Sequence, residues 1–172
     1  MKTVFKVAIV AMFMLFVGNF AKAQAKIGYV NFDDIVRLMP EFKTAQTTID
    51  GYQKQFIDQL TAMNTEYTTK GKEYQAQQAT MTDAIRTAKQ TELADIQKRM
   101  TDYQENARQQ VEAKTNELLK PITDKVKDAV TAVAKEKGYT FVYNSSQTQS
   151  LVIVAPDGDD ITAATKLKLG VK

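Results

Sequence analysis

The chain has 172 residues, with 23 Lys and Arg against 20 Asp and Glu, and it contains no Cys, His or Trp. Without Cys and His it has no disulfide, no thiolate nucleophile, no zinc site of the usual kind and no imidazole general base. This composition argues against most enzyme classes, and the length predicts one domain or at most two.

The first 23 residues have the pattern of a secretory signal peptide. Lys2 and Lys6 precede an apolar run over residues 7–20, and the Ala-Lys-Ala of residues 21–23 supplies the small residues that signal peptidase reads. We expect cleavage after Ala23 and a soluble mature chain, since a lipid-modified lipoprotein would need a Cys at the cleavage point. A retained membrane anchor is disfavoured, because the apolar run is shorter than the ~20 residues that span a bilayer.

The basic excess of the chain lies in this first segment, which holds three lysines and no acidic residue. The remaining chain is formally neutral, with equal numbers of basic and acidic side chains. A nucleic-acid-binding protein needs a surplus of cations to displace counterions, so the sequence predicts no nucleic-acid partner.

Three short segments rich in β-forming residues predict strands at residues 26–32, 139–143 and 151–155. The polar stretch 144–150 between the last two predicts a hairpin. Apolar residues occupy neighbouring positions in these segments, such as Phe141 and Val142. Because neighbouring side chains point to opposite faces of a strand, both faces are apolar. Such a sheet would aggregate alone, so we expect it to be buried by self-association. The expected oligomerisation core is Ile27, Tyr29, Val30, Phe141, Val142, Leu151 and Ile153.

The middle of the chain predicts two long helices. No Pro occurs between Pro40 and Pro121, and apolar residues recur every three or four positions, as in a coiled-coil seam. Folding the chain near Thr80 brings the two seams together and places Phe56 opposite Tyr103.

The position of the reversal is less sharply defined by the sequence. Thr80 is the expected N-cap of the second helix with Asp83 at its third position. Gly71 is a rival turn that would leave arms of very unequal length.

Pro121 predicts either the first turn of a new helix or a kink. Gly138 then ends that helix. A last short helix over 161–169 follows an acidic turn, with Asp160 as its cap. The turn lacks the spacing of a calcium-binding loop, so we expect no metal.

Together these features predict an α+β protein: a small β-sheet body and a long antiparallel helical hairpin. The expected division is a signal peptide at 1–23, a β-rich, self-associating body at 24–40 and 121–172, and a coiled-coil-like arm at 41–120 with its tip near 78–82.

At both ends of the mature chain the residues resemble the OmpH (Skp-like) family of periplasmic chaperones. The similarity lies in residues 26–32, Ile35, Pro40, residues 118–122, Val126, Val130, Val133, residues 134–139, Phe141, Val142 and residues 160–162. The resemblance implies a homotrimer with a shared β-barrel-like core. Three arms would enclose a cavity for unfolded outer-membrane proteins. It also implies an ATP-independent holdase without cofactors, located in the periplasm.

Tyr and Met side chains on or beside the arm seam are the candidate client-binding residues. They have two interpretations: packing within the hairpin, which we favour, and an adaptable apolar surface for varied clients. The candidates are Tyr52, Met63, Tyr67, Tyr74, Met81, Met100 and Tyr103.

Two alternatives stay open at this point. The arms of a structural coiled-coil envelope protein or adaptor would dock on one fixed partner, although such a protein would favour a more regular, Leu-rich seam. Lipopolysaccharide or a membrane surface is a further candidate partner suggested by the family. We assign no residues to it, because eight basic and eight acidic residues cancel between Lys54 and Arg108.

Overall fold

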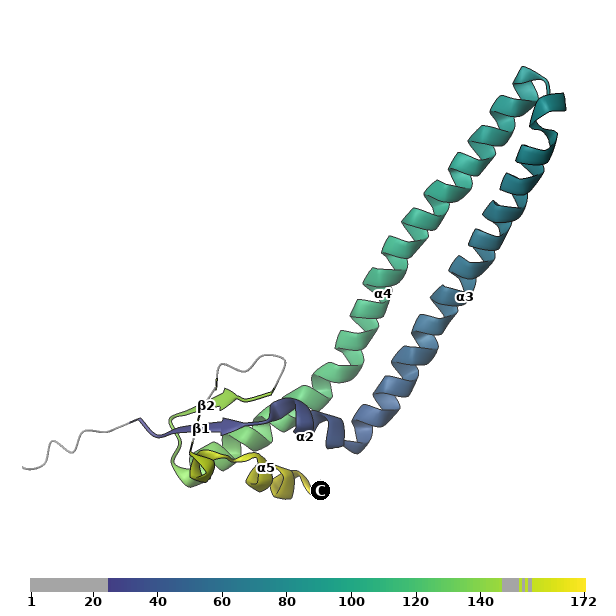
Figure 1. Cartoon of the computed structure of the whole chain (residues 1–172). Helices are drawn as coiled ribbons and strands as arrows, with labels where there is room; N and C mark the ends of the chain where they lie inside the picture. The colour runs from purple at the N-terminus through teal and green to yellow at the C-terminus, as the bar shows by residue number, and fades with distance from the viewer. Residues whose placement is uncertain (1–24, 147–151, 153, 155) are drawn as a thin grey trace, which may run out of the picture.

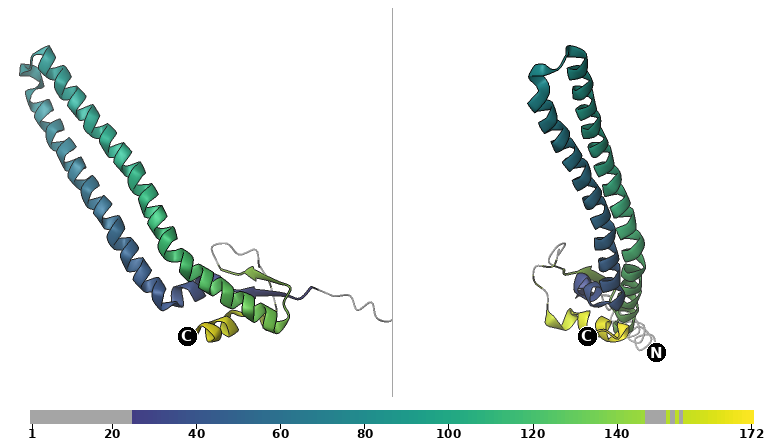
Figure 2. Two further views of the ribbon diagram at one scale, coloured as in Figure 1. Left: turned by 180° about the vertical axis from the view of Figure 1, so that it is seen from behind. Right: turned by 90° about the vertical axis from the view of Figure 1, so that its right-hand side faces the viewer.

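The computed structural model describes residues 25–146, 152, 154 and 156–172. The predicted signal peptide therefore lies outside the described residues. The fold is mostly helical with one small sheet, as expected for an α+β protein. A compact body lies at one end, and a long pair of helices extends from it to a distant tip (Figures 1 and 2).

The long pair consists of α3 (Pro40–Gln77) and α4 (Asp83–Lys137), joined by a single 3₁₀ turn η1 (Gln78–Thr80). The two helices run antiparallel (Figure 1). We call α3, together with the stretch of α4 that faces it, the arm. Its length is about 57 Å, because α3 has 38 residues at about 1.5 Å each. The chain reverses at residues 78–82, and Gly71 lies inside α3, so the rival turn at Gly71 is wrong.

The N-cap of α4 differs from the one predicted. The side chain of Thr82 accepts the hydrogen bond from the Ile85 N–H at 3.4 Å, so Thr82 is the cap. The Thr80 hydroxyl instead donates to the Gln77 carbonyl at 2.9 Å, at the end of the preceding helix. The prediction placed the start of the helix two residues too early, because a Thr at either position has the same preference for a cap.

Helix α4 continues through Pro121 into the body, so Pro121 does not begin a new helix. Figure 1 shows that α4 changes direction between the arm and the body. The helix ends at Gly138, whose φ of 72° is left-handed and whose N–H donates to the Lys135 carbonyl at 3.2 Å. The predicted C-terminal glycine is thereby confirmed, because a left-handed residue is strained unless it lacks a Cβ.

Among the described residues the sheet has two strands, β1 (Ile27–Val30) and β2 (Phe141–Asn144), which pair in parallel with Ile27 opposite Phe141. Both predicted strands exist, but each differs from its expected limits by about two residues. The segment predicted as a third strand lies mostly outside the described residues. Its two described positions, Val152 and Val154, are not in a strand.

After β1 the chain enters a short helix, α2 (Phe32–Leu38), rather than continuing as a strand to Phe32. Asn31 ends the strand because its side chain accepts a hydrogen bond from the Asp34 N–H at 3.2 Å and so begins the helix. The last helix, α5 (Thr162–Leu169), follows the 3₁₀ turn η2 (Asp157–Asp159). The N-cap of α5 is Ile161, one residue after the predicted Asp160, although the Asp160 carboxylate accepts from the first N–H of the helix at 2.7 Å.

One apolar core holds the body together, with contributions from β1, α2, the start of α3, α4 and the N-cap of α5. Its members are Val30, Ile35, Val36, Met39, Ala45, Ile122, Val126, Val133 and Ile161. Ile35, Val126 and Ile161 are completely buried. Within the described part of the chain, no helix combines the length and the hydrophobicity needed to cross a bilayer.

Candidate functional site

The seam of the arm is sparsely buried. Among the arm residues, Ala45 and Ile49 of α3 and Ile96 and Ala107 of α4 are buried, and the other seam positions remain partly in water. Beyond the body, α3 and α4 contact mainly each other among the described residues, so the margins of the seam are uncovered. The arm therefore presents a long surface of half-buried side chains instead of an enclosed pocket.

The seven candidate client-binding residues are all half-buried and are spread along this seam. Three of them have partners within the arm. The Tyr52 hydroxyl donates to Gln110 Oε1 at 3.0 Å, and Gln90 Nε2 donates to the Tyr74 hydroxyl at 2.8 Å. The Tyr103 ring lies 5.9 Å from the Phe56 ring, centroid to centroid. These contacts support the packing interpretation for Tyr52, Tyr74 and Tyr103, while Met63, Tyr67, Met81 and Met100 stay client-binding predictions.

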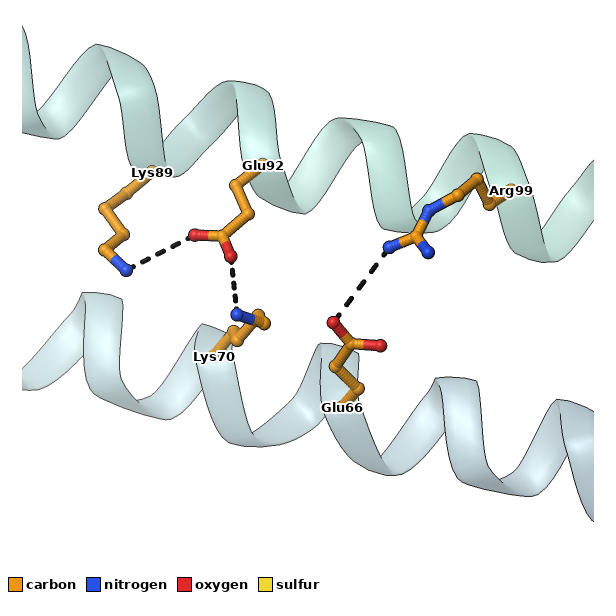
Figure 3. Close-up of polar contacts among 5 residues, drawn as sticks. All are labelled: Glu66, Lys70, Lys89, Glu92 and Arg99. Carbon is orange, nitrogen blue, oxygen red and sulfur yellow. Dashed lines mark hydrogen bonds and ion pairs between the residues drawn. The ribbon is translucent and has the colours of Figure 1, made fainter.

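The sequence reasoning did not single out a group of charged side chains that joins the two helices near the tip (Figure 3). Glu92 of α4 accepts from Lys70 of α3 at 2.5 Å and lies 3.3 Å from Lys89. Glu66 and Arg99 form a looser cross-helix ion pair at 4.0 Å. Charges flanking an apolar seam are a known coiled-coil pattern, so this signal was available in the sequence.

The ion pair changes the protonation behaviour of both partners. The hydrogen bond with Glu92, followed by the Coulomb attraction of that carboxylate, raises the pKa of Lys70. The hydrogen bonds from Lys70 and then Lys89 lower the pKa of Glu92. Both charged forms are therefore favoured by the folded arm, although solvent reaches the pair and limits its strength.

In the body, the sheet divides the predicted oligomerisation residues between its two faces. Ile27 and Phe141 are 48% and 55% exposed, and Tyr143, which the sequence reasoning missed, is 45% exposed. Their shared register puts all three on one face, with the half-buried Tyr29 beside them.

Val30 and Val142 lie on the opposite face, where they pack in the core of the subunit. Leu151 and Ile153 lie outside the described residues. The candidate assembly surface is therefore the exposed face of Ile27, Tyr29, Phe141 and Tyr143, which we call the open sheet face.

The sheet is attached to the end of α4 by contacts around Tyr139. Lys26 Nζ lies 4.2 Å from the centroid of the Tyr139 ring and donates to the Lys137 carbonyl at 2.9 Å. The Tyr139 hydroxyl lies 3.2 Å from Asp159 Oδ1. A Cβ at Gly28 would lie 3.0 Å from this ring, closer than an ordinary van der Waals contact, so glycine favours the close approach of β1 to Tyr139.

One known protein family matches the chain over both the body and the arm. The family model described as outer membrane protein (OmpH-like) matches residues 26–169, a span that includes every described helix and strand. No match was found among curated proteins.

Proposed function

The chain belongs to the OmpH-like outer membrane protein family, and on this basis we propose that it is an ATP-independent holdase chaperone of the periplasm. It would bind unfolded outer-membrane proteins and prevent their aggregation. In this proposal the protein is not an enzyme and uses no cofactor. Residues 24–40 and 121–172 form the trimerisation body, and residues 41–120 form the arm.

The observation that carries the proposal is the half-buried seam of the arm. Apolar and aromatic side chains there are partly exposed over most of the length of two long helices. Many weak contacts of this kind shield an unfolded chain without imposing one shape on it. Met and Tyr suit such a surface, because Met is flexible and Tyr combines an apolar ring with a polar hydroxyl.

The open sheet face supports the trimer. Ile27, Phe141 and Tyr143 expose a contiguous apolar surface in a body that has only two described strands. Burying this surface against copies of itself would cover the sheet face that the subunit's own core leaves exposed. Three arms attached to one body would then enclose a space in which a client is held.

An aggregation assay tests the holdase function. An outer-membrane β-barrel protein unfolded in urea is diluted into buffer without detergent or nucleotide, and light scattering is followed with and without the chaperone. We expect stoichiometric amounts to suppress scattering, whereas a coiled-coil protein of similar length has no effect. Undiminished scattering at a several-fold excess of folded chaperone contradicts the proposal.

A structural adaptor is the second candidate function. The cross-helix contacts of Tyr52, Tyr74 and Tyr103 favour it, since they show that part of the aromatic seam stabilises the arm itself. An adaptor would bind one folded partner and fail to suppress the aggregation of unrelated unfolded proteins, so the same assay separates the two functions.

A further inference from the structure

The two edges of the arm, on either side of its seam, have different chemistry. Successive residues of a helix are rotated by about 100°, so a residue's position fixes the side on which it lies. This arithmetic places Glu66 and Lys70 of α3 on the same edge as Glu92 and Arg99 of α4, and the ion pairs between them agree with it (Figure 3). We call this side the charged edge.

The charged edge continues along α4. A shallow hollow there is lined by Ala88, Glu92, Asp95, Arg99 and Asp102, among others. Charged side chains of both signs thus occupy this edge through the outer half of the arm.

The opposite side, which we call the neutral edge, contains no charged residue from Gln53 to Asn64 on α3 or from Leu93 to Gln104 on α4. By the same arithmetic it consists of Gln53, Ile57, Leu60 and Asn64 on α3, and of Leu93, Gln97, Met100 and Gln104 on α4. Ile57 is 52% exposed, and Leu60, Leu93 and Met100 are half-buried. The four amide side chains are all exposed.

This difference bears on what each edge can bind. Paired helices in water usually flank their seam with charges, which select a partner helix and fix its register. The neutral edge lacks such charges, so it has no charge pattern that would select a partner helix. Its amides can both donate to and accept from peptide groups, and its apolar side chains can cover apolar side chains.

Resting on the holdase function proposed above, we propose that the neutral edge receives the client. We further propose that it takes extended, uncharged segments in which apolar and polar side chains alternate. Charge matching supports this occupant, because a charged segment would find no counter-ion among these residues. Strands of membrane β-barrels have this alternating pattern, with an apolar side chain at every second position.

Photo-crosslinking tests the assignment directly. The chain has no Cys, so a single introduced Cys can carry a photoreactive probe. Gln97→Cys and Gln104→Cys report on the neutral edge, and Asp95→Cys and Asp102→Cys report on the charged edge of the same helix. All four positions are exposed. We expect at least fivefold more cross-linking to a bound, unfolded β-barrel protein from the neutral edge.

Two results would overturn the proposal. Equal or greater client cross-linking from the charged edge would show that the neutral edge is not the receiving surface. Cross-linking from the neutral edge mainly to another chaperone chain would show that a second copy, and not a client, covers it.

A charge-addition experiment separates this proposal from the proposed function. Gln97→Glu with Gln104→Glu adds two charges to the neutral edge. Gln59→Glu with Ala88→Glu adds the same charge to exposed positions of the charged edge. Glutamate keeps a high helix propensity, and circular dichroism checks that the arm is intact.

We expect the neutral-edge variant to hold clients at least tenfold more weakly and the control to hold them like the wild type. If both variants behave alike while the wild type suppresses aggregation, the edge assignment is wrong and the holdase function stands. If the wild type itself fails to suppress aggregation, the function is wrong.

Discussion

Phe56 of α3 and Tyr103 of α4 face each other across the arm, with ring centroids 5.9 Å apart and planes tilted by 49°. Phe56 also meets Tyr52 edge to face at 5.0 Å, so three aromatic rings form one contact group. This group lies in the stretch of arm between the buried pair Ala45 and Ile49 and the buried Ile96.

Replacing Phe56 by Ala should destabilise the arm by about 2 kcal/mol. This is less than the 3–5 kcal/mol typical of a fully buried Phe, because Phe56 is half-buried. Thermal unfolding followed by circular dichroism at a fixed protein concentration measures the change. Gln55→Ala, at the exposed neighbouring position, should change the stability by no more than about 0.5 kcal/mol. Equal stability of the two variants would show that the aromatic group is not a structural contact.

Gly28→Ala should destabilise the body by about 1–3 kcal/mol, the usual effect of adding a group to a packed site. The new Cβ would lie 3.0 Å from the Tyr139 ring and 3.1 Å from the Asp159 carbonyl. Gly51→Ala is the matched control, since nothing lies within 4 Å of its Cβ and Gly51 lies inside α3. At this helical position the substitution should stabilise the arm by about 1 kcal/mol. Chemical denaturation measures the change in the free energy of unfolding. A change of the same sign in Gly28→Ala and Gly51→Ala would contradict the packing around Tyr139.

The ion pair of Lys70 and Glu92 should make the outer arm sensitive to pH in a defined direction. Because Glu92 has a lowered pKa in the folded arm, its contribution is complete above its ordinary pKa and is lost as the pH falls through the lowered value. Because Lys70 has a raised pKa, to which Glu66 and Glu73 also contribute, its contribution is lost as the pH rises through that raised value. The outer arm should therefore be most tightly closed between these limits.

Spin labels on Gln75→Cys and Ala84→Cys, two exposed positions near the tip, can measure this effect. We expect their distance distribution to broaden in acid. With Glu92→Gln in addition, the acid-dependent change should disappear, while Glu112→Gln should leave it in place. An unchanged acid response in Glu92→Gln would show that other groups control the outer arm.

Phe141→Asp should dissociate the proposed trimer, because burying a charge without a partner costs several kcal/mol in a shared apolar interface. Leu167→Asp is a suitable control, since Leu167 is an 81% exposed apolar residue in α5 outside the sheet. Light scattering coupled to gel filtration at micromolar concentration measures the mass. A Phe141→Asp protein with the mass of the wild type would exclude the open sheet face as the interface.

Periodicity in the sequence was enough to predict the arm, because both seams follow one helical repeat and each helix continues for many turns. The contact between Phe56 and Tyr103 was predicted in this way and is confirmed. Gly138 was also predictable, since a left-handed helix end has a strong preference for glycine.

Other features depend on tertiary contacts that local sequence does not encode. The strand propensity of an apolar segment does not determine which other strand it pairs with. The pairing of β2 with the distant β1 could therefore not be deduced from the sequence. Pro121 left a new helix and a kinked helix as alternatives, because a proline removes only one helical hydrogen bond and need not end a helix. Ile122 and Val126, which follow directly, are buried in the body and hold the helix in place.

Because α4 is continuous, a small change of its direction near the body moves the distant tip of the arm by a large distance. This single helix of 55 residues is anchored in the body by its C-terminal part and carries the arm on the remainder. Pro121 lies near the junction, about 57 Å from the far end of the helix at 1.5 Å per residue. A bend of about 10° at that point would sweep the tip through about 10 Å. Small repacking around Ile122 would thus be magnified into a large change in the space that the arm borders.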